Sequence, residues 1–142
     1  HHIGDRALRD VAGVLRNGIR PYDICIRYAG DEFIVVLAGC GGEEAERKRL
    51  ELQHAVDELQ FEPRPGRTLR LAISIGAAIF PHDGTSYEAL LATADSRMYR
   101  DKSRRKRASQ QTGDADPTTA RSTEEDQGLS DGEVRRAAVG IL

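Results

Sequence analysis

The chain has 142 residues, of which 39% are hydrophobic and 31% are charged, and its formal net charge is −2. This length suits one domain and is too short for two domains with separate cores. The near-neutral charge and the absence of tryptophan argue against a nucleic-acid binder, and no apolar stretch approaches the ~18 residues that span a bilayer. Two cysteines are too few for a disulfide framework.

Composition divides the chain at Arg107. Residues 108–142 carry seven acidic residues against three basic ones, a net charge of −4, and no aromatic residue. Such a segment buries too little apolar surface to offset the entropy lost on ordering. We therefore expect a folded domain over 1–107 and a disordered acidic tail over 108–142, in which only the stretch from 134 to 142 could form a short helix.

Apolar periodicity predicts the first elements. Apolar residues spaced three and four apart predict a helix that starts near Asp5 and ends before Gly18. Strands are expected over 24–28 and 33–37, because both runs are largely apolar. The short segment between these strands predicts a hairpin turn.

The second half of the domain continues with a helix expected over 43–60. Prolines and a glycine then break the chain, and a long strand region follows over 69–80. Ser86 is a suitable N-cap for a last helix. This order predicts an α/β (α+β) fold in which helices pack against a sheet.

Two adjacent carboxylates, Asp31 and Glu32, lie at the hairpin turn. Neighbouring carboxylates repel each other unless a cation compensates them, and Mg²⁺ binds both carboxylates and phosphates. The small residues Ala29 and Gly30 would let a nucleotide approach the backbone closely. The residues alone therefore predict a magnesium–phosphate site, with an ordinary acidic hairpin as the alternative.

Four motifs, in the right order and spacing over residues 1 to about 106, resemble those of the GGDEF family, the diguanylate cyclases. The first two are H-H-I-G-D-R-A-L, which is similar to G-H-x-x-G-D-x-x-L, and the turn R-Y-A-G-D-E-F-I-V-V-L. The others are S-I-G-A-A-I-F-P-H-D-G, similar to S-I-G-V-A…P-x-D-G, and L-L-A-T-A-D-S-R-M-Y-R-D-K, similar to L-L-x-x-A-D-x-A-M-Y-x-A-K. The resemblance implies a palm-like cyclase fold with a central, mostly antiparallel sheet flanked by helices.

The resemblance also implies a reaction. Family members condense two GTP into cyclic di-GMP and release pyrophosphate, and each domain of a homodimer brings one GTP. Two Mg²⁺ ions, for which Mn²⁺ could substitute, assist the displacement. Asp31 and Glu32 would bind the metals, and Glu32 would help to activate the attacking 3′-hydroxyl. The substrate-binding positions implied by the motifs are Asp5, for guanine, and Ala29, Gly30, Lys102 and Lys106, around the phosphates.

A second site is implied by Arg20-Pro21-Tyr22-Asp23, whose distance from the turn matches the R-x-x-D site at which the family binds its product. Arg20 would offer a planar fork to guanine or phosphate, and Asp23 would accept from guanine. The alternative is an arginine at a helix end that is held by a turn aspartate. A second arginine usually completes this site, and Arg47 and Arg49 are the nearby candidates.

The chain departs from the family pattern in three ways. Ala29 replaces the first glycine of the turn, and Lys106 stands where a phosphate-binding arginine is expected. The resemblance also begins inside G-H-x-x-G-D, so we expect the family's first strand, with a metal-binding aspartate, to be missing. We therefore expect a cytoplasmic cyclase in the intact protein and an inactive fragment here. The alternatives are a weakened domain that senses cyclic di-GMP or GTP, and a structural remnant.

Overall fold

The structure, a computed structural model, describes residues 2–112 and 136–141. The helices are α1 (His2–Asn17), α2 (Gly42–Asp57) and α3 (Tyr87–Thr112). The strands are β1 (Ile24–Ala29), β2 (Glu32–Leu37), β3 (Gln60–Arg64), β4 (Arg67–Arg70), β5 (Ser74–Ile79) and β6 (Arg136–Ile141). None of the described helices is both long and apolar enough to cross a membrane.

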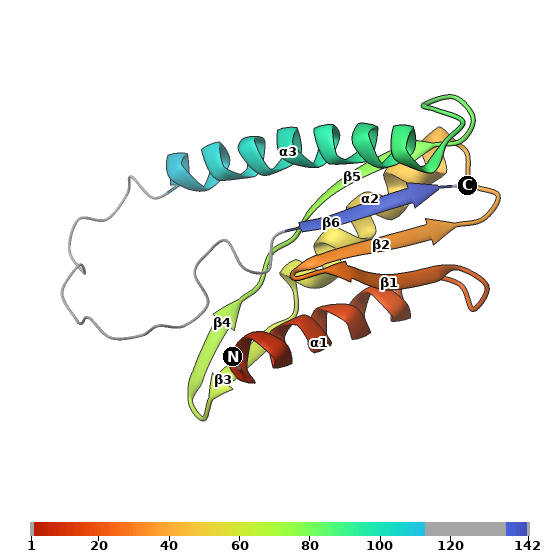
Figure 1. Cartoon of the computed structure of the whole chain (residues 1–142). Helices are drawn as coiled ribbons and strands as arrows, with labels where there is room; N and C mark the ends of the chain where they lie inside the picture. The colour runs from red at the N-terminus through yellow and green to blue at the C-terminus, as the bar shows by residue number, and fades with distance from the viewer. Residues whose placement is uncertain (1, 113–135, 142) are drawn as a thin grey trace.

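Four strands form the main sheet in the order β1-β2-β6-β5, and β3 pairs with β4 in a separate hairpin (Figure 1). Antiparallel pairing joins β1 to β2, whereas β6 runs parallel to both of its neighbours. The mixture of helices and antiparallel hairpins confirms the predicted fold class. The main sheet itself is mixed rather than mostly antiparallel, because the C-terminal strand enters its centre in the parallel direction.

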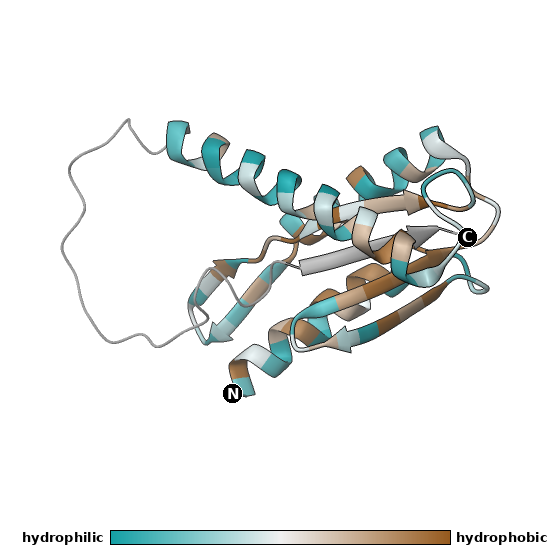
Figure 2. Ribbon diagram, turned by 45° about the horizontal axis from the view of Figure 1, so that its top comes forward, coloured by the Kyte–Doolittle hydropathy of each residue, from teal (hydrophilic) through white to brown (hydrophobic). Residues whose placement is uncertain are grey.

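Helices cover both faces of this sheet. Phe33, Val35 and Ile75 belong to the main core, which includes residues of α1 and α2. Ala78 instead packs with residues of α3. Since successive side chains of a strand point to opposite faces, α1 and α2 cover one face and α3 covers the other. Hydrophobic residues are concentrated in β1 and β2, whereas the second half of α3 is hydrophilic (Figure 2).

The helices and the first hairpin agree with the sequence predictions. Ser86 caps α3, since its Oγ accepts a hydrogen bond from Ala89 N at 3.1 Å. The single strand predicted over 69–80 is wrong, because β4 and β5 are separate strands in different sheets. Sequence reasoning missed β3, since the break around Gly66, whose φ is 80°, is the turn of the β3–β4 hairpin.

The C-terminal region differs from its prediction where the structure describes it. Helix α3 continues to Thr112, five residues beyond the predicted boundary of the folded domain. The short helix expected near the end is wrong, because residues 136–141 form strand β6. An uncharged run after Arg136 suits a strand with a neighbour on either side. The rest of the predicted tail, 113–135 and 142, lies outside the described residues.

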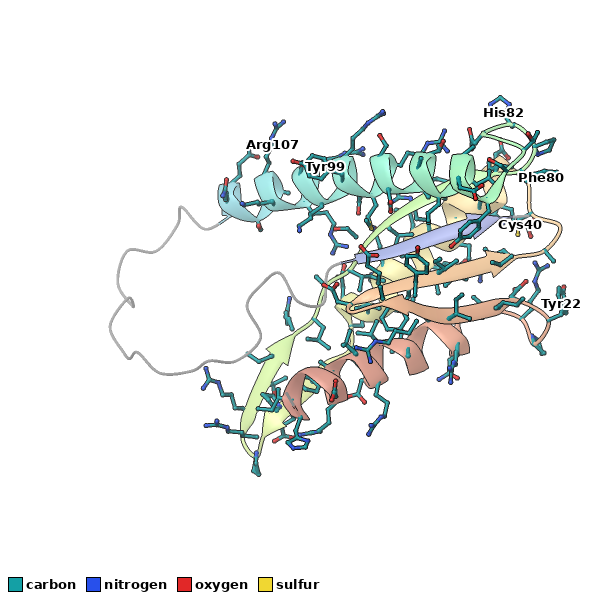
Figure 3. All side chains as sticks on the ribbon, viewed as in Figure 1. Tyr22, Cys40, Phe80, His82, Tyr99 and Arg107 are labelled. Carbon is teal, nitrogen blue, oxygen red and sulfur yellow. The ribbon has the colours of Figure 1, made fainter. Side chains whose placement is uncertain are left out.

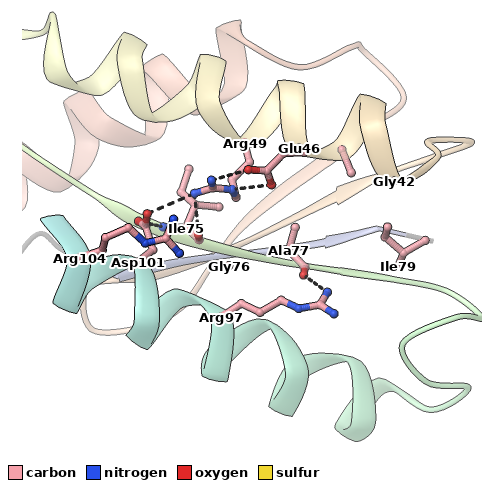
Figure 4. A pocket seen from close by; sticks show the side chains of 11 residues that line it. Gly42, Glu46, Arg49, Ile75, Gly76, Ala77, Ile79, Arg97, Asp101 and Arg104 are labelled. Carbon is pink, nitrogen blue, oxygen red and sulfur yellow. Dashed lines mark hydrogen bonds and ion pairs between the residues drawn. The ribbon is translucent and has the colours of Figure 1, made fainter.

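The outer edge of β5 is capped by charged side chains. Arg97 Nη1 donates to Ala77 O at 2.7 Å, and Asp83 Oδ2 accepts from Ile79 N at 2.8 Å. Farther along the strand, Arg49 Nη1 and an oxygen of Asp101 bind the backbone of Ile75 (Figure 4). A hollow of about 300 Å³ lies between α2, β5 and α3 at this edge. The cap satisfies backbone groups that have no neighbouring strand.

Candidate functional site

The acidic turn lies at the tip of the β1–β2 hairpin, as the sequence predicts. Gly30 has φ = 50°, in the left-handed region that glycine adopts readily. Arg27 Nε donates to Gly30 O at 2.7 Å, and the strand register shifts between Arg27 and Ala29. Ala29 and Gly30 are exposed, and Asp31 and Glu32 are partly buried. The turn is therefore held by its own arginine and presents two carboxylates.

Glu32 lies on the side of the sheet that α3 covers. Phe33 and Val35 are buried in the core beside α1 and α2. The alternation of side chains along β2 turns Glu32 and Ile34 to the opposite face. Glu32 thus lies on the same side of the sheet as α3.

Lys102 is carried to the same end of the sheet. Asp101, its neighbour on α3, accepts a hydrogen bond from Ile75 N at 3.4 Å, near the start of β5. Ser74 and Glu32 stand opposite the same residue of β6, so they are separated by two strand spacings, about 10 Å. The start of β2, the start of β5 and the α3 turn that carries half-buried Lys102 therefore lie at the same end and on the same face of the sheet, with β6 between the two strands.

Lys106 is exposed and lies one helical turn farther along α3. The neighbouring Arg105 donates to Ile73 O at 2.5 Å and pairs with Asp57 at 2.7 Å. This stretch of α3 therefore lies beyond the start of β5. Lys106 shares the end of the sheet with Lys102 but is farther from the strands.

Asp5 lies on the other face. It lines a hollow of about 570 Å³ between α1 and the β1–β2 hairpin, together with Arg27 and Phe33. Arg9 and Arg16, from the same side of α1, also line this hollow, so three arginines face one carboxylate. Sequence reasoning missed Arg9 and Arg16, although their spacing of four and eleven residues from Asp5 places all three on one helix face. The lining side chains therefore carry a net positive charge, which suits an anionic ligand.

Cys25 lines the same hollow and is a free thiol. Burial raises its pKa, although the nearby Arg16 acts in the opposite direction. The thiol therefore stays protonated at neutral pH and adds no charge to the hollow.

The carboxylates of the turn suit a hard cation but do not complete a metal site. Carboxylate oxygens are ligands that Mg²⁺ and Mn²⁺ prefer. Within residues 2–112 and 136–141, no group of three or more histidine, cysteine, aspartate or glutamate residues is arranged to hold a metal. Asp31 and Glu32 therefore fit as part of a donor set, and further ligands would have to come from phosphate, water or residues outside the described ones.

Arg20 and Asp23 lie at the opposite end of the sheet, on the loop that carries Tyr22 (Figure 3). The Asp23 carboxylate, with its side chain 1% exposed, accepts from Arg20 N at 2.9 Å and from Arg20 Nε and Ala38 N, both at 3.1 Å. Burial alone would raise the pKa of Asp23, but the hydrogen bonds from Arg20 and Ala38 hold it below its usual value. Asp23 thus organises the loop itself.

The outer side of Arg20 remains accessible. Its side chain is 40% exposed and stacks over the Tyr22 ring, with 4.8 Å between the guanidinium carbon and the ring centroid. Arg49, a candidate for completing an R-x-x-D site, is instead paired with Glu46 at 2.6 Å and directed to the β5 edge. The Arg20–Asp23 pair has the contact expected of a helix-end arginine held by a turn aspartate, and it leaves the outer side of Arg20 exposed.

Comparison with known proteins agrees with the motifs. A family model described as "Diguanylate cyclase, GGDEF domain" matches residues 1–108. The chain is 35% identical over 99 residues to diguanylate cyclase DosC of Escherichia coli (strain K12), covering 70% of this chain and 21% of that protein. It is also 35% identical over 103 residues to response regulator PleD of Caulobacter vibrioides (strain NA1000 / CB15N), covering 72% of this chain and 23% of PleD.

An uncharacterized Bacillus subtilis protein, YhcK, is 31% identical over 102 residues, which cover 72% of this chain and 28% of YhcK. The chain thus spans well under a third of the length of these relatives. The family model nevertheless covers most of the chain and includes the acidic turn, α1 and α3 as far as Ala108. The chain belongs to the GGDEF family of diguanylate cyclase domains.

Proposed function

We propose that the intact protein carrying this domain condenses two GTP into cyclic di-GMP with release of pyrophosphate. The observation that carries the proposal is that the Asp31–Glu32 turn and the Lys102 turn of α3 lie at the same end and on the same face of the sheet. Carboxylates that can hold Mg²⁺ beside an ammonium group suit a triphosphate. Since GTP is a cytoplasmic nucleotide, we expect the domain to act there.

Each side chain has a defined task in this reaction. Asp31 and Glu32 would hold Mg²⁺ or Mn²⁺, which when bound lowers the charge on the phosphates and acidifies the attacking hydroxyl. Lys102 and Lys106 would compensate phosphate charge. The Asp5 carboxylate would accept hydrogen bonds from the guanine N–H groups.

The stoichiometry requires a partner. In each half-reaction a 3′-oxygen forms a bond to the α-phosphorus of the other GTP, the bond from that phosphorus to pyrophosphate breaks, and the hydroxyl proton leaves. One acidic turn per chain suits one GTP, so the reaction would need two copies of the domain facing each other. We therefore propose a homodimer as the active form.

Product binding at Arg20 is a further part of the proposal. The available groups are the outer side of the Arg20 guanidinium and the Tyr22 ring, since the Asp23 carboxylate already accepts several hydrogen bonds. Cyclic di-GMP would stack on Tyr22 and bind Arg20. To bind Asp23 as well, it would have to displace bonds within the loop.

The second candidate is a domain that binds GTP or cyclic di-GMP without catalysis. The observation in its favour is the incomplete donor set, because the described residues supply two carboxylates and no third ligand. Such a domain would retain nucleotide affinity and lack turnover.

The test is turnover of GTP by the intact protein with Mg²⁺, followed by chromatography of the nucleotides. We expect cyclic di-GMP from the natural protein and at least a hundredfold less from Glu32→Gln. Asp10→Asn, which neutralises an exposed carboxylate on α1, is the matched control and should keep full activity. GTP binding with no product from the natural protein would favour the sensor, and neither binding nor product would refute both.

A further inference from the structure

A buried polar junction joins α2, β5 and α3 (Figure 4). Asp101 of α3 is only 8% exposed. Its Oδ2 accepts from Gln53 Nε2 at 2.5 Å and from Ile75 N at 3.4 Å, and Arg49 Nη1 lies 3.4 Å from Oδ1. Every one of these donors belongs to another element, so the carboxylate connects the helix to its surroundings.

The junction fixes α3 along its own axis. A carboxylate removed from water is unfavourable unless hydrogen bonds and opposite charge compensate it. A slip of α3 by one turn, about 5.4 Å, would move the Asp101 carboxylate away from Gln53, Arg49 and the Ile75 N–H at once. The helix therefore has one position over β5 in which this carboxylate is satisfied.

Both α3 residues at this edge differ from the family motif quoted above. Where the family motif reads A-M-Y-x-A-K, this chain reads R-M-Y-R-D-K, so Arg97 and Asp101 occupy the two alanine positions. The two residues are four apart, on one face of the helix. Both bind the edge of β5, since Arg97 donates to Ala77 O and Asp101 accepts from Ile75 N.

We propose that Asp101 is a positioning residue for Lys102, the next residue on α3, and that it acts on nucleotide affinity only through that lysine. The inference rests on the proposed function, in which Lys102 contacts the phosphates. Lys102 is half-buried, and the turn of α3 that carries it lies at the end of the sheet that also carries the acidic turn. Its ammonium can meet a phosphate only if the helix turn beneath it stays in place, and the buried carboxylate provides that restraint.

The experiment is a double-variant cycle in the intact protein, with Mg²⁺ and 3′-deoxy-GTP as the probe, because this nucleotide lacks the attacking hydroxyl. Affinity is measured by calorimetry for the natural protein, Lys102→Ala, Asp101→Ala and the variant with both changes. We expect Lys102→Ala to weaken binding about tenfold, as for a lost charged hydrogen bond. Asp101→Ala should weaken it severalfold, and the double variant should bind no worse than Lys102→Ala alone.

The matched control is Arg97→Ala, which breaks a charged contact on the same helix face one turn earlier and should leave affinity within twofold. Thermal unfolding checks that each variant folds. Should Asp101→Ala not fold, Gln53→Leu takes its place in the cycle, since it removes the shortest bond of the junction and leaves the Arg49 charge paired.

The outcomes separate this inference from the proposed function. Losses from Lys102→Ala and Asp101→Ala that add in the double variant would overturn the inference, as would unchanged affinity in Asp101→Ala beside a weakened Lys102→Ala. An equal loss of affinity in Arg97→Ala would also overturn the inference, because any contact that anchors α3 would then affect nucleotide binding as much as Asp101 does. Unchanged affinity in Lys102→Ala would show that this lysine does not contact the nucleotide, and the inference would then fail. The proposed cyclase activity is tested separately, by Glu32→Gln.

Discussion

Replacing Gly76 with alanine should push α3 away from β5. A Cβ at this position would stand 1.9 Å from Ala94 O and 2.4 Å from Met98 N, both of them backbone atoms of α3. Ordinary contact begins at 3.4 Å, which is 1.5 Å farther away than Ala94 O would stand, so the helix would have to shift. A backbone cannot rotate aside as a flexible side chain can, and the shift would also stretch the bonds of Asp101.

Overpacking of a core typically costs about 1–3 kcal/mol. The upper end applies here because the obstructing atoms are backbone, so we expect Gly76→Ala to lower the free energy of unfolding by ~3 kcal/mol. That is a large fraction of the ~5–15 kcal/mol that stabilises a typical domain. With an m-value of about 2 kcal/mol per molar urea, the unfolding midpoint should fall by roughly 1.5 M.

Urea unfolding followed by far-ultraviolet circular dichroism measures this loss. Gly13→Ala is the matched control, because its added methyl group meets nothing within 4 Å and the residue lies inside α1. Alanine is the better helix former by about 0.5–1 kcal/mol, so this variant should be slightly more stable than the natural protein. Equal midpoints for Gly76→Ala and the natural protein would refute the close approach of α3 to β5.

Three further perturbations test the fold and the loops. The ion pair with Arg97 holds the pKa of Asp83 below its usual range, so the stability that this pair contributes is present above about pH 4 and is lost as pH falls through the folded-state pKa of Asp83. In urea titrations, the difference in unfolding free energy between the natural protein and Arg97→Gln should be large at pH 7 and should shrink below pH 4. A difference that stays constant with pH would contradict this. Ser86→Ala removes the cap of α3 and should cost about 1 kcal/mol in thermal unfolding, whereas no loss would mean that the cap contributes nothing. Asp23→Ala leaves backbone donors of the loop unpaired and should lower the free energy of unfolding by about 2–3 kcal/mol. This loss should exceed that of Arg20→Ala, because the Arg20 side chain is partly exposed. A larger loss in Arg20→Ala would show that the Asp23 carboxylate does not organise the loop.

Local patterns in the sequence were sufficient to predict much of the fold. The three- and four-residue spacing of apolar side chains located α1, α2 and the start of α3, and the hairpin that carries Asp31 follows from two apolar runs around a short turn. The β3–β4 hairpin escaped prediction because its proline and glycine residues are typical both of a chain break and of a turn. Strand β6 escaped because pairing with β2 depends on contacts over a hundred residues apart in the chain.

The parts of the site that depend on distant contacts were also hidden. Asp101 accepts a hydrogen bond from Gln53, 48 residues away in the sequence, and the spacing of apolar residues cannot predict such a pair. The one available signal was chemical, a charged residue at a helix position where the motif has alanine. Burial of Asp23 was equally invisible, because R-x-x-D reads the same whether its carboxylate faces a ligand or its own loop.

The charged cap on β5 has a consequence for how the protein behaves at high concentration. A bare strand edge is a template on which a strand of another molecule can pair, and that is a common route to aggregation. Arg97, Asp83 and Asp101 already occupy backbone groups on the β5 edge, so an incoming strand would have to displace them. Intermolecular growth of the main sheet is therefore directed to its opposite border at β1, where Ile24 and Ile26 are both about half exposed.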